Sequence, residues 1–316
     1  MCIAFFEWSE DRFLVCHNRD EYFSRPTINT QWWPDDIVGK DGKGDDRFQI
    51  LAPRDVVSGG TWFGFEKTTG RCAFLTNINN DGDNNTVYAS SRGELVIRYL
   101  TSDPSLSALD YLRREFGRRE RGNGGDDLSP GTNCAGFNLV AFSGRDLAYV
   151  SNRSQVQNHD NSNNKQREKK IPYYYEPIAL EKGIPYGLSN SLLQEPMIKV
   201  TKGLEIFQQV VQQYRNTTPM ALNTNNEEAT RNDRMLDKLE ELMRQTSVFY
   251  DEHQDGLAST ALELSKADVR KHRSSIICIP QDDHEYGTRT TIRFLLESKR
   301  GVPNDRDERQ PSQFLR

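Results

Sequence analysis

The stretch MCIAFFEWSEDRFLVCHNRDE, residues 1–21, decides the fold prediction because it is typical of a β-hairpin. Strand-forming residues at 2–8 and 13–16 flank a short polar turn. If that turn centres on Glu10, residues that pair across the hairpin have numbers that sum to about 20, which places Cys2 opposite Asn18. The sequence therefore predicts that Cys2 begins the first strand beside a polar segment of the second.

Cys2 is the candidate nucleophile. A small residue at position 2 permits removal of Met1, after which Cys2 carries both a thiol and a free α-amine. The amine has an unperturbed pKa of about 7.7–8.0 and can act as general base to the thiol of the same residue. The alternative, which is commoner for an arbitrary cysteine at this position, is a small buried hydrophobe that starts a strand.

The tetrapeptide Asn18-Arg19-Asp20-Glu21 supplies candidate partners for Cys2. Arg19 can lower the pKa of the thiol, and Asp20 can hold the α-amine. The alternative is an ordinary turn or a salt-bridged surface patch. None of the five histidines lies in a triad-like pattern, so the predicted chemistry uses no catalytic histidine.

The rest of the chain predicts antiparallel sheets flanked by helices, an α+β fold. Strands are expected near residues 48–51, 61–66, 71–77, 136–142, 146–151, 274–279 and 290–297, and helices near 91–100 and from Asp103-Pro104 onward. Two later helices are expected from apolar stripes, Val200, Leu204, Phe207, Val211 and Tyr214 on one and Leu236, Leu239, Leu242 and Met243 on the other. We expect a loop at 32–47, a disordered insertion at 152–170 and a disordered tail at 298–316.

Composition excludes several functional classes. The 316 residues carry a net charge of −5, which gives no strong field toward nucleic acid or anionic membrane. The five cysteines show no CxxC pairing, so we predict reduced thiols, no metal site and no cofactor. The apolar stretch after Met1 is too short for a signal peptide, and no run is long enough to span a membrane. We expect a cytoplasmic protein, with peripheral attachment to an organelle left open.

Eight motifs in one order resemble those of the NRDE family, also called the Transport and Golgi organization protein 2 family. They cover about positions 1–297, which we expect to form a single domain. In chain order they are MCIAFF with NRDE (residues 1–6 and 18–21), GGTWFG (59–64), AFLTN (73–77), SRG (91–93), GFNL (136–139), YGLSNS (186–191), SSII (274–277) and YGTRTT (286–291).

The resemblance implies an N-terminal-nucleophile (Ntn) hydrolase-like sandwich with four layers, α-β-β-α. It also implies a more distant likeness to bile-salt hydrolase, penicillin V acylase and acid ceramidase. By position, the catalytic roles of those enzymes would fall to Cys2, Arg19, Asp20, Asn77, Asn190 and Arg289. Asp20 directly follows Arg19 here, whereas a gap separates the two in those enzymes, so Asp20 and Glu21 both remain candidates to hold the amine.

A ligand pocket is expected around Cys2, lined by Asn18, Glu21, Gly60, Thr61 and Trp62. Gly60 would let the backbone approach a ligand, and Trp62 could wall an apolar pocket, although such an aromatic is more often part of the core. Asn77 and Asn190 could donate to an oxyanion, or could form turns or caps.

Three functions remain open. The family resemblance implies a role in protein secretion and Golgi organisation and in trafficking of haem or an acyl-CoA-like lipid, with association to Golgi or mitochondria. A non-catalytic carrier and a factor that acts through protein contacts both fit that role. The alternative is a cysteine amidohydrolase that cleaves a linear amide such as an N-acyl lipid.

Overall fold

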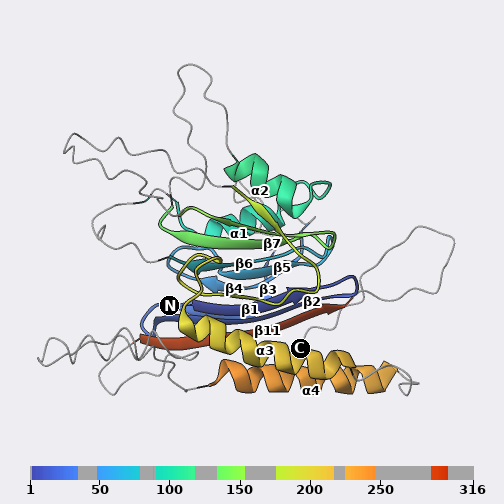
Figure 1. Ribbon diagram of the computed structural model, residues 1–316. Helices are drawn as coiled ribbons and strands as arrows, with labels where there is room; N and C mark the ends of the chain where they lie inside the picture. Colours follow the sequence, from blue (N-terminus) through green and yellow to red (C-terminus); the bar gives the residue numbers. More distant parts are fainter. Residues whose placement is uncertain are drawn as a thin grey trace, which may run out of the picture. The chain divides into compact units, whose positions relative to one another are not determined.

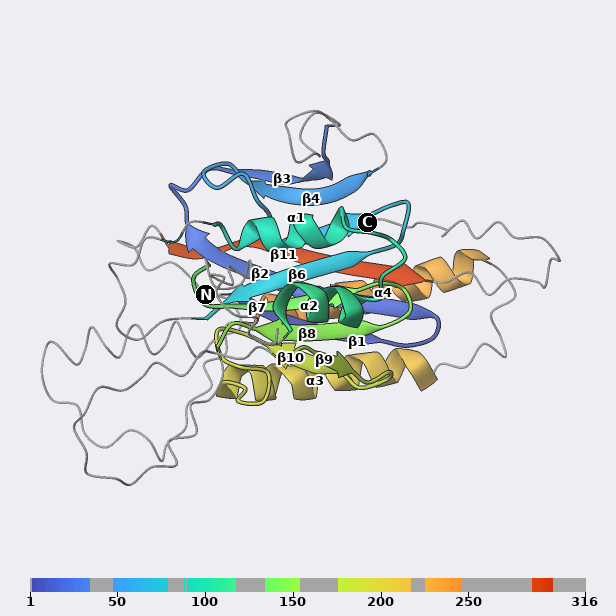
Figure 2. The same cartoon turned by 90° about the horizontal axis from the view of Figure 1, so that it is seen from above.

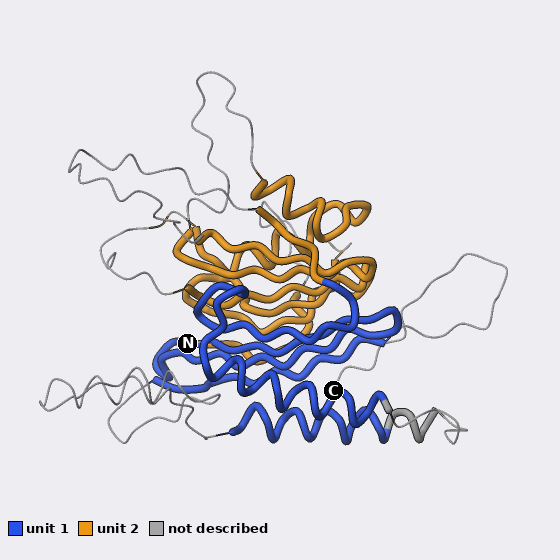
Figure 3. Tube along the Cα trace, viewed as in Figure 1, with its two compact units in different colours: residues 1–26, 181–316 blue, residues 27–180 orange. Residues whose placement is uncertain are grey.

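The computed structural model describes residues 2–34, 48–78, 88, 90–117, 134–153, 176–216, 225–245 and 286–297. The chain divides into two compact units, shown in different colours in Figure 3. The first unit is formed by the two ends of the sequence, Met1–Pro26 and Glu181–Arg316, and the second by Thr27–Leu180. The expected single domain over residues 1–297 stays a prediction.

A four-stranded antiparallel sheet organises the described part of the first unit. Its strands lie in the order β10 (Tyr186–Leu188), β1 (Cys2–Trp8), β2 (Arg12–Tyr22) and β11 (Tyr286–Glu297). The two central strands are the predicted N-terminal hairpin, which is confirmed. Strands β2 and β11, whose paired residues are 264 to 285 positions apart in the sequence, thus lie side by side, as Figure 1 shows.

The register of the hairpin differs from the prediction by one residue. Cys2 pairs with Arg19, and Asn18 pairs with Ile3. The backbone N–H of Ser9 donates to the carbonyl of Arg12 (2.8 Å), so the turn centres between residues 10 and 11 rather than on Glu10. Because neighbouring residues of a strand point to opposite faces, the correction places Arg19, not Asn18, on the face of Cys2.

Two helices, α3 (Ile198–Asn216) and α4 (Asn225–Met243), cover one face of this sheet in Figure 1. Alternate strand residues pack against them, Ile3 and Phe5 from β1 and Leu14 and Cys16 from β2. The helices contribute the apolar stripes that the sequence predicts, including Val200, Phe207, Val211, Leu236, Leu239, Leu242 and Met243. Both predicted helices are therefore confirmed.

A glycine in β10 sets how closely α3 can approach the sheet. A Cβ atom added to Gly187 would lie 2.6 Å from Cγ1 of Val200, which is shorter than any van der Waals contact allows. The absence of a side chain there lets the first turn of α3 pack directly on the strand.

The second unit contains a seven-stranded antiparallel sheet in its described part, in the order β3-β4-β5-β6-β7-β8-β9. Helices α1 (Gly93–Leu100) and α2 (Ala108–Phe116) pack on β5 to β8, and Figure 2 shows both lying over these strands. The strands are Thr27–Trp32, Ile50–Asp55, Phe63–Glu66, Cys72–Asn77, Phe137–Phe142, Leu147–Ser151 and Ile178–Leu180. The predicted mixed α+β fold with antiparallel sheets is confirmed.

Three local predictions for the second unit need correction. Helix α2 begins at Ala108 rather than near Asp103, because the Ser107 hydroxyl accepts from the N–H of Asp110 and caps the helix, whereas the Asp103 carboxylate binds Ser105. Strand β3 was not predicted and contains Trp32, where a loop was expected. The short strand β9 was also not predicted, and neither was β10 of the first unit.

The expected insertion at 152–170 begins too early. Asn152 is buried, and its side chain accepts from the N–H of Phe137 (2.7 Å) and donates to the carbonyls of Cys134 and Ala135 (3.1 Å each). Residues 154–170, the expected strand at 274–279 and the expected tail lie outside the described residues.

Candidate functional site around Cys2

The backbone of Cys2 is held by hydrogen bonds on both sides. Its N–H donates to Oδ1 of Asn190 (3.1 Å), and the hydroxyl of Ser189 donates to its carbonyl (2.6 Å). All three residues are buried, with Cys2 4% exposed. The predicted site residues Cys2 and Asn190 therefore lie in direct contact.

Strand pairing explains why Ser189 and Asn190 meet Cys2. In the β1–β10 ladder Ala4 pairs with Leu188, so the next residues of the chain run alongside the start of β1. Ser189 was not singled out from the sequence, although it lies within the YGLSNS motif. Its place in that motif, directly before Asn190, was the available signal.

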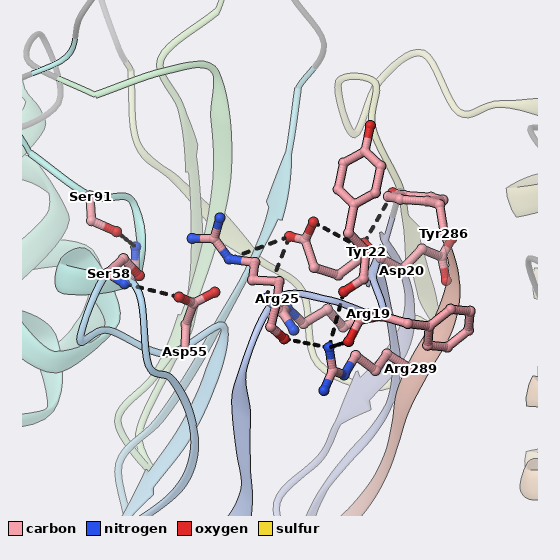
Figure 4. Close-up of polar contacts among 12 residues, drawn as sticks. Arg19, Asp20, Tyr22, Arg25, Asp55, Ser58, Ser91, Tyr286 and Arg289 are labelled. Carbon is pink, nitrogen blue, oxygen red and sulfur yellow. Dashed lines mark hydrogen bonds and ion pairs between the residues drawn. The ribbon is translucent and has the colours of Figure 1, made fainter. Parts of the chain in front are cut away.

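Arg19 lies opposite Cys2 on the neighbouring strand. Its Nη2 is 3.5 Å from Oε2 of Glu21, and Nε of Arg25 lies 3.9 Å from the same oxygen. Figure 4 shows the side chains of Arg19 and Arg25 at this end of β2. The Arg19 side chain is only 6% exposed, so its charge acts on its neighbours with little screening by water.

Asp20 is a buried carboxylate beside this cluster. The hydroxyl of Thr288 donates to its Oδ1 (2.6 Å). Burial raises the pKa of Asp20, while the chain's amino terminus, the Thr288 hydrogen bond and the charge of Lys199 act in the opposite direction. Lys199 is itself buried (1% exposed) in the first turn of α3, and the sequence prediction missed it. Thr288 was missed too, although it lies within the predicted YGTRTT motif.

Burial also raises the pKa of the Cys2 thiol. The amino terminus, the backbone N–H of Asp20 and the charge of Arg19 lower this pKa, and the Asp20 carboxylate raises it further. The predicted sign of the Arg19 effect is therefore right, but desolvation is the larger influence. Cys16, buried in the adjacent strand, also has a raised pKa, about 12.

Asn18 and Arg289 make contacts away from Cys2. The Asn18 side chain donates to the carbonyl of Met243 (2.8 Å) at the end of α4 and accepts from Thr291 (2.8 Å), so its amide joins β2, β11 and α4. Arg289 lies at the register shift of β11, between Thr288 and Thr290. Its Nη1 donates to the carbonyls of residues 22, 23 and 25, as Figure 4 shows for Arg289.

The remaining predicted site residues, Gly60, Thr61, Trp62 and Asn77, belong to the second unit. A Cβ atom at Gly60 would lie 2.6 Å from the backbone carbon of Gly93, so this glycine permits close packing on the start of α1. The Thr61 hydroxyl donates to the carbonyl of Phe63 (2.7 Å), and Trp62 is buried. Asn77 ends β6, where it pairs with Phe137.

Within the described residues, no group of three His, Cys, Asp or Glu side chains is arranged to hold a metal ion. None of the helices in the described ranges is long and apolar enough to cross a membrane.

Comparison with known proteins assigns the chain to a family. The profile of the family Transport and Golgi organisation 2 matches residues 1–303, so the chain belongs to this family. A Transport and Golgi organization protein 2 homolog from Bos taurus is 30% identical over 229 residues, which cover 70% of this chain and 68% of the relative.

Two further relatives carry the same description. The homolog from Homo sapiens is 29% identical over 219 residues, 67% of this chain and 65% of the relative. The protein from Drosophila melanogaster is 24% identical over 306 residues, 95% of this chain and 89% of the relative. The chain thus spans about two thirds of the mammalian relatives and most of the insect one.

Proposed function

We propose that the chain acts in secretion and Golgi organisation by binding a small amphipathic ligand, haem or an acyl-CoA-like lipid, around Cys2. The observation that carries this proposal is the pair of hydrogen bonds by which Ser189 and Asn190 hold the backbone of Cys2. Cys2 lies opposite Arg19 on the neighbouring strand. A fixed backbone at Cys2 and a buried guanidinium on the neighbouring strand together suit an apolar ligand with an anionic group.

The raised pKa of the Cys2 thiol favours a carrier over an enzyme. A nucleophilic cysteine needs a substantial fraction of thiolate, and burial raises the pKa of Cys2, which reduces that fraction at neutral pH. Binding has no such requirement. The name of the relatives also refers to transport, which agrees with a carrier role.

A cysteine amidohydrolase is the second candidate, favoured by the contact between Asn190 and the nitrogen of Cys2. If Met1 is removed, this nitrogen becomes an α-amine next to its own thiol, which is the arrangement of an N-terminal nucleophile. The Asn190 carboxamide would then orient the amine through Oδ1. Asp20 and Glu21 are both candidates to hold the ammonium form, because each carboxylate lies within two residues of Arg19, the strand partner of Cys2.

The four-layer Ntn-hydrolase-like arrangement and the location of the protein are part of the same proposal. Each unit supplies one antiparallel sheet with a pair of helices packed on it, which is the content of an α-β half-sandwich. We place the protein in the cytoplasm, in association with Golgi or mitochondria; of these locations, the name of its relatives mentions the Golgi.

The test compares Cys2→Ser with Cys134→Ser, a second buried cysteine in the other unit. Intact mass first reports whether Met1 is removed. Haemin titration and a fluorescent acyl-CoA then measure binding, and a fluorogenic N-acyl amide measures hydrolysis. A carrier retains ligand binding in both variants and shows no Cys2-dependent turnover.

Two outcomes decide between the candidates. Turnover by the wild type that is lost in Cys2→Ser but kept in Cys134→Ser establishes the amidohydrolase and removes the pure carrier. Absence of binding to both probes, in a folded wild-type protein, contradicts the ligand site itself.

A further inference from the structure

The turn that follows β2 presents two aromatic side chains to solvent. Tyr22 is 58% exposed and Phe23 is 42% exposed. The N–H of Arg25 donates to the carbonyl of Tyr22 (3.1 Å) and closes this segment, the Tyr22–Arg25 turn. Because Cys2 pairs with Arg19, the turn lies at the same end of the four-stranded sheet as Cys2.

The backbone of the turn is fixed from β11. Nη1 of Arg289 donates to the carbonyls of Tyr22 (3.0 Å) and Phe23 (2.7 Å), and also to that of Arg25. The Tyr22 ring packs edge-on against Tyr286 with centroids 5.0 Å apart. The aromatic side chains are therefore exposed on a preorganised backbone, so little conformational entropy remains to be lost when they are buried against a partner.

Positive charge accompanies these aromatics. The side chain of Arg25 is 34% exposed, and Arg289 lies beneath the turn, as Figure 4 shows for both residues. Glu21 is the acidic neighbour, 21% exposed, and it lies within ion-pair distance of Arg19 and Arg25. The immediate surface of the turn thus combines aromatic rings with an excess of guanidinium groups.

We propose that the Tyr22–Arg25 turn, together with Arg289, docks the protein on membranes that contain anionic lipid. Aromatic rings favour the headgroup region, and each arginine near an anionic surface contributes about 1 kcal/mol of attraction, or roughly fivefold in affinity. A small protruding turn fits a lipid surface better than a protein partner, because a specific protein interface buries about 800 Å² on each side. The docking is expected to be weak and reversible, because only a few side chains supply it.

This docking surface goes beyond the proposed ligand site. It uses none of the contacts of Cys2, Ser189 or Asn190, so Cys2→Ser should leave it intact. Its position at the Cys2 end of the sheet would bring that site toward the membrane, where amphipathic ligands are concentrated.

The experiment is flotation of the full chain with vesicles of phosphatidylcholine, with and without phosphatidylserine. We expect binding to the vesicles with phosphatidylserine, reduced by salt. The double variant Tyr22→Ser with Phe23→Ser should lose about tenfold in affinity, because both rings leave the interface. Arg25→Gln should lose about fivefold.

Matched controls come from the same unit. Ile184 is also exposed (45%), but Gly183 bonds the carbonyl of Trp8, so Ile184 lies at the opposite end of β1. Ile184→Ser and Lys182→Gln, the latter at a lysine 46% exposed near the same end of β1 as Ile184, should bind like the wild type. Melting temperatures check that every variant folds.

Three results overturn the proposal. In the first, the wild type does not float with either kind of vesicle. In the second, the double variant Tyr22→Ser with Phe23→Ser floats as well as the wild type. In the third, Ile184→Ser loses as much vesicle affinity as the double variant. A turn variant that loses binding to an acidic protein but keeps vesicle binding would assign the surface to a protein partner instead.

Discussion

Buried arginines of the two units differ in what they bind. In the second unit, Arg71 is 1% exposed and donates to neutral acceptors of one loop, the carbonyls of Tyr99, Ser102, Asp103 and Leu106 and the hydroxyl of Ser102, at 2.6–3.4 Å. In the first unit, Arg19 is 5% exposed and faces ionisable groups, Glu21 at 3.5 Å and Cys2 on the next strand.

The difference separates a structural charge from a charge that can act in chemistry. Arg71 fixes the end of α1 and the segment that follows it, and the acceptors of its hydrogen bonds are uncharged backbone carbonyls and a hydroxyl. Arg19 alters the pKa of Cys2 and lies among groups whose charge can change. Replacing Arg71 should therefore change mainly stability, and replacing Arg19 should change mainly reactivity.

The largest effect is expected for Arg71→Ala. The change removes a buried side chain and leaves several carbonyl groups of a partly exposed segment without their donor, at a combined cost of about 3–5 kcal/mol in the free energy of unfolding. Urea denaturation measures this. Arg145→Ala is the control, because its exposed side chain makes one bond to the same loop, and it should cost no more than about 0.5 kcal/mol. Equal costs would contradict the structural role of Arg71.

The next effect is expected for a pair of buried asparagines. Asn190→Ala and Asn152→Ala each remove buried hydrogen bonds and should each lower the free energy of unfolding by about 1–3 kcal/mol. Only Asn190 contacts Cys2, so only Asn190→Ala should also alter the rate of Cys2 alkylation, read by mass spectrometry at native conditions. If Asn152→Ala changed that rate equally, the effect would be loss of stability rather than loss of the site.

Arg19→Gln should change the rate of Cys2 alkylation more than it changes stability. Arg19 lowers the pKa of Cys2, so its loss raises that pKa further and slows alkylation of Cys2 at neutral pH severalfold. Gln keeps much of the buried packing of Arg19, and Glu21 keeps Arg25 as a partner, so stability should fall by about 1–2 kcal/mol, less than for Arg71→Ala. The pH profile of alkylation, with Arg98→Gln on α1 as control, makes the measurement. A large loss of stability with an unchanged pH profile of alkylation would show that Arg19, like Arg71, has mainly a structural role.

The smallest effect is the pH dependence of Asp20. Its folded-state pKa is raised above the ordinary value of 3.8, so the folded state binds more protons than the unfolded state and stability falls as pH rises through that window. Asp20→Asn cannot ionise and keeps an oxygen for Thr288. The free energy of unfolding of Asp20→Asn minus that of the wild type should therefore increase as the pH rises from below 3.8 through the raised pKa of Asp20. If this difference in the free energy of unfolding did not change with pH, the pKa of Asp20 would not be raised in the folded state.

The sequence predicted the elements whose patterns are local. The N-terminal hairpin, the helix pair with apolar stripes and the hairpin formed by β7 and β8 each carry their own turn or periodicity. Strands β9 and β10 have three residues each, too few to show an alternation, and β10 is defined by its pairing with β1. The start of α2 was misplaced because both Asp103 and Ser107 are chemically suitable caps.

The candidate site was predictable only in part, for a similar reason. The contact of Cys2 with Asn190 follows from motif resemblance, but Ser189, Thr288 and Lys199 reach the site through the β1–β10 and β2–β11 ladders and the first turn of α3. A shift of one residue in the hairpin exchanged Asn18 for Arg19 opposite Cys2. Register of this kind depends on turn geometry, which composition does not specify.

Because of the register shift in β11, the effect of deleting Arg289 differs from the effect of deleting another residue of the strand. Thr288 pairs with Asp20 and Thr290 with Arg19, so Arg289 is an extra residue between two consecutive pairs. Deleting it would leave both halves of the ladder aligned and remove only the guanidinium that holds the neighbouring turn. Deleting a residue between 290 and 297 would instead invert the faces of every later side chain, so equal deletions a few positions apart would have unequal consequences.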